Sequence, residues 1–331
     1  MRSFTRAAVA YSLIIILLIL PVSSFPQTTV NKQPKHSFLA ESSEGLLMAR
    51  LVTPEGIVRM YLPDEMAGGD TISGTVTVEP KGATDAEKAL NSDVLNGYVF
   101  DLGDGTKVKA DEPRFTWVPK VTQPSTQAKY VLKVVEVLAK TGETVASNNI
   151  SILTVPPPVP TNINFPALGQ NGHPVQITGP FDGNSANTKA NIGGEPVSVI
   201  AESPRKSIVR APARMAGPYS ITAIDGVKVG SGEIRIVGVN LSAAKLNLAK
   251  GEKTTLTVNI TGLQGLSTPV AVQIVTTGSV NMQGGNTQTL GITPGNVGAP
   301  GVFIQTYDLT AIQAGGFSVI ATVLTGGPPG K

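Results

Sequence analysis

The sequence predicts an all-β protein, built from three tandem β-sandwiches that follow an N-terminal signal sequence. Apolar and polar residues alternate in many short runs, and turn residues separate these runs every 8–12 residues. The 331 residues contain one convincing helical segment, 36 glycines and 25 prolines, and glycine and proline together make about 18% against an average near 12%. Many short strands with many turns are typical of sandwiches and barrels.

Residues 1–24 have the features of a signal peptide. Arg2 and Arg6 give a positive start, Ala7–Leu20 is an apolar run of 14 residues, and small residues precede a predicted cleavage after Ser24. A bilayer requires about 20 apolar residues, so the alternative is an uncleaved signal anchor. We expect an exported protein, secreted or in the cell envelope, that touches a membrane only through this segment when it is not cleaved.

Composition excludes several classes of function. The chain has no cysteine, which excludes disulfides, thiolate metal sites and cysteine nucleophiles. Without Arg2 and Arg6, 24 basic and 23 acidic residues remain, a net charge of +1, and no basic stripe is present. We therefore expect no nucleic-acid partner. A protein or a polysaccharide at the cell surface is the expected partner.

The chain after the signal divides into a spacer and a first block. Residues 25–45 are polar and without a period, which predicts a flexible spacer. Residues 46–155 form the first block, because apolar residues recur at about every second position. The clearest predicted strands of this block are 56–62, 71–78 and 130–137.

One helix interrupts the first block. Thr84 and Glu87 have the spacing of a capping box, which marks a helix start. Ala86, Leu90 and Val94 then recur at i, i+4 and i+8 and predict an apolar face over one edge of the sandwich.

Two further blocks complete the chain. Four prolines in residues 156–160 predict a stiff linker to a second block over residues 161–237. A third block covers residues 238–325, with no proline-rich linker before it, and residues 326–331 are a C-terminal tail. The predicted strands are 175–178, 188–192, 197–202, 207–211, 219–225 and 233–237 in the second block, and 256–260, 270–274 and 317–323 in the third.

The first block resembles a PKD domain. Tyr98–Thr106, with the sequence YVFDLGDGT, is similar to the aromatic-Asp-x-Gly-Asp-Gly turn of that family, and Pro113–Trp117 and Tyr130–Leu132 follow in the family's order. Phe100 stands where the family usually has tryptophan, and 83–94 looks like an insertion. The resemblance implies an Ig-like sandwich that serves as an extracellular spacer or adhesion module.

The second block resembles an IPT/TIG domain, another Ig-like fold. The matching segments are Ile177–Phe181, Ala190–Val197, Ile208–Pro212 and Gly217–Thr222. The third block resembles no family in its residues, and its strand pattern alone suggests another sandwich. The three sandwiches are thus expected to be Ig-like. None of these resemblances implies a catalytic residue set.

Asp101 and Asp104 are the only closely spaced acids with a spacing that suits a metal ion. Calcium binds six to eight oxygens, and aspartates in a glycine-rich turn can supply several. A tight turn that needs Asp for local hydrogen bonds and Gly for positive φ explains the same residues. The turn is the preferred interpretation, calcium is the alternative, and no other cofactor is expected.

Trp117 and Tyr130 are the candidate ligand-binding residues, since flat aromatic rings can stack on sugars. Tyr61 and Tyr98 could extend such a platform. The alternative is that these residues, which lie in or beside predicted strands, belong to the cores, as a lone tryptophan usually does in an Ig-like sandwich.

No catalytic constellation is present in the sequence. His173 lies in a predicted surface loop, His36 lies in the predicted spacer, and no Gly-x-Ser-x-Gly elbow, His-Glu-x-x-His motif or phosphate loop occurs. We therefore expect a non-enzymatic scaffold or adhesion-type protein that binds a partner through strand edges or loops. The alternatives are a carbohydrate-binding accessory protein and, less favoured, a hydrolase with an unrecognised site.

Overall fold

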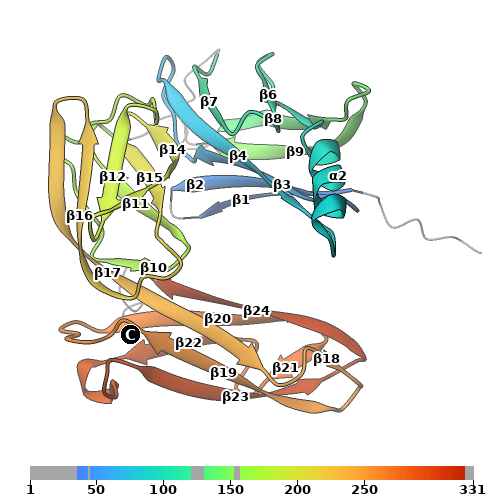
Figure 1. Cartoon of the computed structure of the whole chain (residues 1–331), viewed down its shortest axis with the longest axis vertical. Coiled ribbons are helices and arrows are strands. Elements are labelled where there is room, and N and C mark those ends of the chain that lie inside the picture. Colours follow the sequence, from blue (N-terminus) through green and yellow to red (C-terminus); the bar gives the residue numbers. More distant parts are fainter. Residues whose placement is uncertain (1–35, 44, 121–129, 153–156, 325–331) are drawn as a thin grey trace, which may run out of the picture. The chain divides into compact units, whose positions relative to one another are not determined.

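The computed structural model describes residues 36–43, 45–120, 130–152 and 157–324, so the predicted signal sequence and C-terminal tail lie outside the described residues. Nearly all of the described secondary structure is β, which confirms the predicted fold class. Its mostly antiparallel strands form four sheets, and three hydrophobic cores lie between them, as in tandem β-sandwiches (Figure 1).

The first sandwich contains nine strands, which are β1 (Ser37–Ser43), β2 (Leu46–Val52), β3 (Gly56–Pro63), β4 (Ile72–Pro80), β5 (Val99–Asp101), β6 (Lys107–Lys109), β7 (Arg114–Trp117), β8 (Tyr130–Leu138) and β9 (Thr144–Ile152). One sheet has the order β1-β2-β3-β4, with β7 on β4, and the other has the order β6-β5-β8-β9. The alternation in β3 places Val58, Met60 and Leu62 in one core with Phe100 of β5.

The structure corrects the predicted spacer. Ser37–Ser43, which the sequence places in that spacer, form β1 and pair antiparallel with β2. Phe38 and Ala40 alternate along β1 and pack against the first core. Two inward apolar residues are too few to show as a period in the sequence, and the strand forms because the edge of β2 supplies its backbone partners.

The helix α2 (Asp85–Leu95) begins where the capping box predicts. The Thr84 side chain accepts a hydrogen bond from the Glu87 N–H at 3.2 Å, and the Glu87 carboxylate accepts one from the Thr84 N–H at 3.1 Å. The predicted apolar face is wrong, since Leu90 and Val94 are 67% and 42% exposed. The helix contacts β3 and β4, and its only buried residue is its last one (Figure 1). No helix in the described ranges has both the length and the apolar content to cross a membrane.

The second sandwich adds eight strands, which are β10 (Leu168–Gln170), β11 (Pro174–Thr178), β12 (Thr188–Ile192), β13 (Glu195–Val197), β14 (Val199–Ser203), β15 (Lys206–Arg210), β16 (Gly217–Asp225) and β17 (Lys228–Ala243). One of its sheets continues the sheet of the first sandwich in the order β4-β14-β15-β11, with Glu202 of β14 opposite Ser73 of β4. The other runs β13-β12-β16-β17, with β10 parallel to β17.

The third sandwich shares β17 with the second. Its other elements are β18 (Asn247–Leu248), β19 (Lys253–Thr261), β20 (Val270–Gly278), β21 (Val280–Met282), β22 (Thr287–Ile292), the 3-10 turn η1 (Pro294–Asn296), β23 (Phe303–Ala311) and β24 (Gly315–Leu324). The first part of β17 pairs with β16 and residues 238–243 pair with β19. This continuous strand explains why no linker composition occurs near residue 237.

Hydrogen bonds between side chains and backbone join the first two sandwiches. The Ser73 hydroxyl donates to the Gly183 carbonyl at 2.6 Å and accepts from the Ser185 N–H at 3.1 Å. The Thr75 hydroxyl donates to the Ile200 carbonyl at 2.8 Å. Gly183 has a φ of +80°, and a Cβ there would lie 1.8 Å from the carbonyl oxygen of Thr71. Only glycine therefore permits this close approach.

Charged and apolar side chains reinforce the same junction. The Lys206 ammonium lies 2.5 Å from an Asp64 carboxylate oxygen and 3.6 Å from one of Glu65, and Arg205 pairs with Asp70 at 2.6 Å. A small apolar cluster lies beside them and consists of Leu46, Tyr61, Ile200, Ala201 and Ile208. The proline-rich segment before the second block thus does not hold these two sandwiches apart.

Candidate functional site

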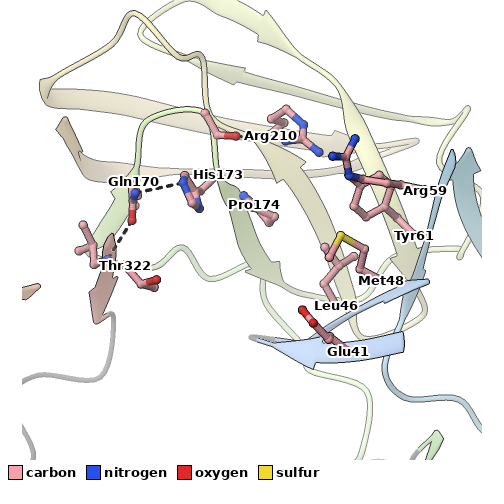
Figure 2. Close-up of a pocket in the computed structure, with 13 residues that line it drawn as sticks. Glu41, Leu46, Met48, Arg59, Tyr61, Gln170, His173, Pro174, Arg210 and Thr322 are labelled. Carbon is pink, nitrogen blue, oxygen red and sulfur yellow. Dashed lines mark hydrogen bonds between the residues drawn. The ribbon is translucent and has the colours of Figure 1, made fainter. Parts of the chain in front are cut away.

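A cavity of about 500 Å³ lies where side chains from all three sandwiches meet (Figure 2). Strands β1, β2 and β3 supply its floor, the β10–β11 turn and β15 supply one wall, and β24 supplies the remainder. Its lining residues are Glu41, Leu46, Met48, Arg59, Tyr61, Gly169, Gln170, Gly172, His173, Pro174, Arg210, Thr322 and Val323.

The floor of the pocket is a row of side chains across three strands. Glu41 is opposite Met48 in the β1–β2 register, and Met48 is opposite Tyr61 in the β2–β3 register. The neighbouring residues Leu47 and Met60 belong to the first core, so this row lies on the other face of the sheet. Strands are about 4.8 Å apart, which places the backbones of Glu41 and Tyr61 about 10 Å apart.

Arg210 of β15 covers one end of this row. Its guanidinium carbon lies 5.6 Å from the centre of the Tyr61 ring, which is a cation–π distance, and its Nη1 donates to the Gly172 carbonyl at 3.1 Å. In the described part of the chain no carboxylate lies within ion-pair distance of this guanidinium. The half-buried positive charge of Arg210 is therefore not neutralised by a neighbouring acid.

Arg59 brings a second guanidinium to the pocket. Its Nη1 lies 2.6 Å from a carboxylate oxygen of Glu79, and the Glu79 side chain is 64% exposed. An exposed pair of this kind adds little stability. The Arg59 charge is nevertheless already matched, in contrast to that of Arg210.

Gln170 connects the pocket wall to the third sandwich. Its Oε1 accepts from the Val323 N–H at 2.8 Å, and its Nε2 donates to the Ala321 carbonyl at 3.0 Å. The backbone of β24 thus fixes the orientation of the amide. Its Nε2 also lies 3.0 Å from His173 Nε2, so the histidine nitrogen must accept.

His173 is therefore a neutral imidazole with its proton on Nδ1. Partial burial lowers the pKa of His173, and the positive charge of Arg210 lowers it further. A protonated ring would also point an N–H at the Gln170 amide N–H₂. The sequence predicts a surface-loop histidine, and the ring does lie in the exposed β10–β11 turn, but it also contacts Gln170, whose amide bonds to β24 of the third sandwich.

Asp101 ends β5, Asp104 lies in the turn that follows, and both accept backbone hydrogen bonds. Asp101 accepts from the Gly103 N–H and Asp104 from the Thr106 N–H, each at 2.9 Å. Gly103 and Gly105 have φ values of +81° and +90°, as the turn interpretation requires. No group of three or more His, Asp or Glu side chains within the described ranges is arranged to hold a metal ion. The calcium alternative stays a prediction.

Trp117 lies in the first core and not in the pocket. It is 2% exposed, and its indole N–H donates to a carboxylate oxygen of Asp104 at 2.8 Å. Burial alone raises the pKa of Asp104, but the hydrogen bonds from Trp117 and from the Thr106 and Lys120 N–H groups bring it below the ordinary value. The hydrogen bond from Trp117 to Asp104 secures the turn to β7. Tyr130 begins β8, and its side chain lies outside the described residues.

A buried acid at the first junction, which joins the first and second sandwiches, was not anticipated from the sequence. Glu202 is 0% exposed, and neither carboxylate oxygen meets hydrogen-bond geometry. Burial raises the pKa of Glu202 to about 7, although the nearby hydroxyls of Thr188 and Ser207 offset part of this shift. A charged residue directly after the apolar run Val199–Ala201 is the only signal that could have marked it.

The pocket residues come from β1, β2, β3, β10, β11, β15 and β24, and no sequence motif unites them. Tyr61 is the one sequence-predicted aromatic candidate that lines the pocket, and the Arg210 guanidinium covers its ring. The other candidate residues with described side chains, which are Tyr98, Asp101, Asp104 and Trp117, do not line it and lie in the first core or around the β5 turn.

A comparison with family models and a comparison with curated proteins each found no match. The chain is similar to solved structures of β-sandwich proteins, among them the following three. A glucan utilization locus protein of Bacteroides ovatus, in complex with a mixed-linkage heptasaccharide, is 11% identical, with 88% of this chain and 91% of that chain covered and a TM-score of 0.25. The insect immune protein hemolin is 12% identical, with 84% and 81% covered and a TM-score of 0.21. Domains 3 and 4 of rat CD4 are 10% identical, with 47% and 98% covered and a TM-score of 0.22. Values this low carry no argument about function.

Proposed function

We propose that this chain is an exported, non-enzymatic scaffold or adhesion-type protein of the cell envelope or cell surface, which binds a partner and does not transform it. The observation that supports this most directly is the bonding across both junctions. A sheet continues from β4 to β14, and the single strand β17 belongs to two sandwiches. Such continuity holds loops, edges and the shared pocket in fixed positions, which is what a binding scaffold requires.

An exposed strand edge offers one place for a partner. Among the described strands, β22 (Thr287–Ile292) pairs only with β20, and its sequence contains no charged residue and no proline. Charges and prolines are the usual protection of a free edge. The backbone of β22 can therefore accept an added strand from a protein partner.

The carbohydrate-binding alternative depends on an exposed aromatic platform. Trp117, Tyr61 and Tyr98 are 2%, 7% and 6% exposed, so none of these three rings offers a free face to a sugar. We therefore propose a protein partner ahead of a polysaccharide. The PKD and IPT/TIG assignments of the first and second sandwiches are part of this proposal and rest on the sequence resemblance alone.

The experiment is a binding screen that also measures turnover. The purified chain is applied to a glycan array and to a peptide array. Each ligand that binds is then incubated with the chain and recovered, and its mass is measured by mass spectrometry. We expect binding with the ligand recovered unchanged. Cleavage or modification of the ligand by the purified chain would overturn the non-enzymatic proposal, and binding confined to glycans would favour the alternative.

A further inference from the structure

We propose that the pocket shared by the three sandwiches binds the C-terminal carboxylate of a peptide chain whose last residue is apolar. This inference deepens the proposed function and rests on it, because it names the chemistry of a partner for one particular site. It uses a place on the molecule that the sequence did not indicate.

The guanidinium of Arg210 provides the positive charge that would bind the carboxylate. One of its five N–H donors is used by Gly172, and its charge has no acidic partner in the described part of the chain. Tyr61 and Gly172 hold it in place from two sides. A planar guanidinium that is fixed and unpaired matches the two oxygens of a carboxylate.

The other ionisable side chains of the pocket are paired, neutral or distant from Arg210. Arg59 is matched by Glu79, and the lowered pKa of His173 leaves that ring neutral at pH 7. Glu41 lies at the opposite end of the floor row, about 10 Å from Tyr61 by strand spacing. An anionic group is thus attracted to the Arg210 end and repelled from the Glu41 end. Figure 2 shows Arg210 and Glu41 on opposite sides of Met48 and Leu46.

An apolar surface lies between the Arg210 end and the Glu41 end of the pocket. Leu46, Met48, Pro174 and Val323 line the cavity, which has a volume of about 500 Å³. Pockets of about 300–1,000 Å³ with an apolar lining and a few fixed polar groups are typical of small-ligand sites. A terminal Leu, Val or Phe side chain would contact this lining while its carboxylate meets Arg210.

A sugar fits this pocket less well. The ring of Tyr61 faces Arg210 and is 7% exposed, so it is not free for stacking. The polar atoms of Gln170 are used by β24 and are not available for hydroxyl groups. Binding of an uncharged oligosaccharide is therefore an outcome that would contradict the proposal.

The test uses the complete chain and matched peptides. Acetyl-Gly-Ala-Leu with a free carboxylate is compared with the same peptide as its C-terminal amide, by calorimetric titration or NMR shift mapping. We expect the acid to bind at least about tenfold more tightly than the amide, because a charge-assisted hydrogen bond is lost with the amide. A second pair ending in aspartate tests the apolar requirement, and hexanoate tests whether a free acid without a peptide backbone suffices.

Two variants assign the binding to this pocket. Arg210→Gln removes the charge and is expected to bring the affinity for the acid down to that of the amide. Arg214→Gln is the matched control, since Arg214 lies outside the pocket in an exposed pair with Glu195. If Arg210→Gln does not fold, Met48→Trp fills the floor of the cavity and is expected to abolish binding of the acid.

Besides binding of an uncharged oligosaccharide, three results would overturn the proposal. These are equal affinity for acid and amide, unchanged affinity in a folded Arg210→Gln or Met48→Trp variant, and no binding of the acid up to about 1 mM. None of these results contradicts the scaffold proposal, which fails instead if a ligand is recovered cleaved or modified.

Discussion

The Gln170 side chain and the Val323 backbone join the second sandwich to the third by a buried hydrogen bond of 2.8 Å from the Val323 N–H to Gln170 Oε1. The same amide donates to the Ala321 carbonyl and to His173 Nε2. One side chain of β10 thus satisfies the edge of β24 and closes the wall of the pocket. The contacts that join these two sandwiches therefore also shape the wall of the proposed binding pocket.

Replacement of Gln170 by leucine is expected to destabilise the protein by about 2–4 kcal/mol. The change leaves a buried N–H and a buried C=O of β24 without partners, and each unsatisfied group costs about 1–3 kcal/mol. Urea denaturation measures the loss. The control is Gln264→Leu, at an exposed position of the third sandwich, and an equal loss in both variants would contradict the assigned role.

His173 makes the stability of the second junction, which joins the second and third sandwiches, depend on pH. Its pKa lies below the ordinary 6.5, so the folded protein binds this proton less readily than the unfolded chain does. The stability it contributes is present above pH 6.5 and is lost as the pH falls through the lowered pKa. The difference in denaturation midpoint between the wild type and His173→Gln, measured from pH 8 to pH 5, should therefore shrink at the acidic end. A difference that is constant with pH would contradict this.

Glu202 should have the opposite dependence at the first junction. Burial raises its pKa from 4.5 to about 7, so the stability contributed by the neutral carboxyl is lost as the pH rises from 4.5 through about 7. Glu202→Gln keeps the shape and removes the charge. We expect this variant to be more stable than the wild type at pH 8 by up to about 3 kcal/mol, with no such gain at pH 4.5. Glu233→Gln, on the exposed face of β17, is the control.

Lys206 holds two acids at the first junction. Its side chain is 5% exposed, and it contacts carboxylate oxygens of Asp64 and Glu65. Lys206→Met leaves the nearly buried Glu65 without this cation and is expected to destabilise the protein by about 3–5 kcal/mol. Addition of Glu65→Gln should recover part of the loss in a double-mutant cycle of denaturation free energies. If the two changes are simply additive, the pair does not act as a unit.

The local structure followed from the sequence where each residue's role depends on near neighbours. Thr84 and Glu87 marked the start of α2 because a capping box lies within four residues. The strand alternation around Met60 and the glycines of the Asp101–Gly105 turn were equally local signals. The apolar face of α2 was misplaced because Leu90 and Val94 remain exposed while the helix packs through its end.

The candidate site could not follow from the sequence for the opposite reason. Arg210, Tyr61 and Val323 belong to three sandwiches, and only the pairing of β4 with β14 and the length of β17 bring them together. β1 was missed because its polar residues hide two inward apolar positions, and Glu41 on that strand completes the pocket floor. Each of these features depends on partners that are distant in the chain.

We expect the described sandwiches to unfold as one bonded unit, and Trp117 allows a direct test. The sequence contains a single tryptophan, which lies in the first core, so its fluorescence reports the first sandwich, whereas far-UV circular dichroism reports all the strands. Urea denaturation should give the same midpoint by both probes, as a cooperative unit requires. A fluorescence transition that is complete before the circular dichroism changes, or that follows it, would show that the sandwiches unfold independently and would contradict the account.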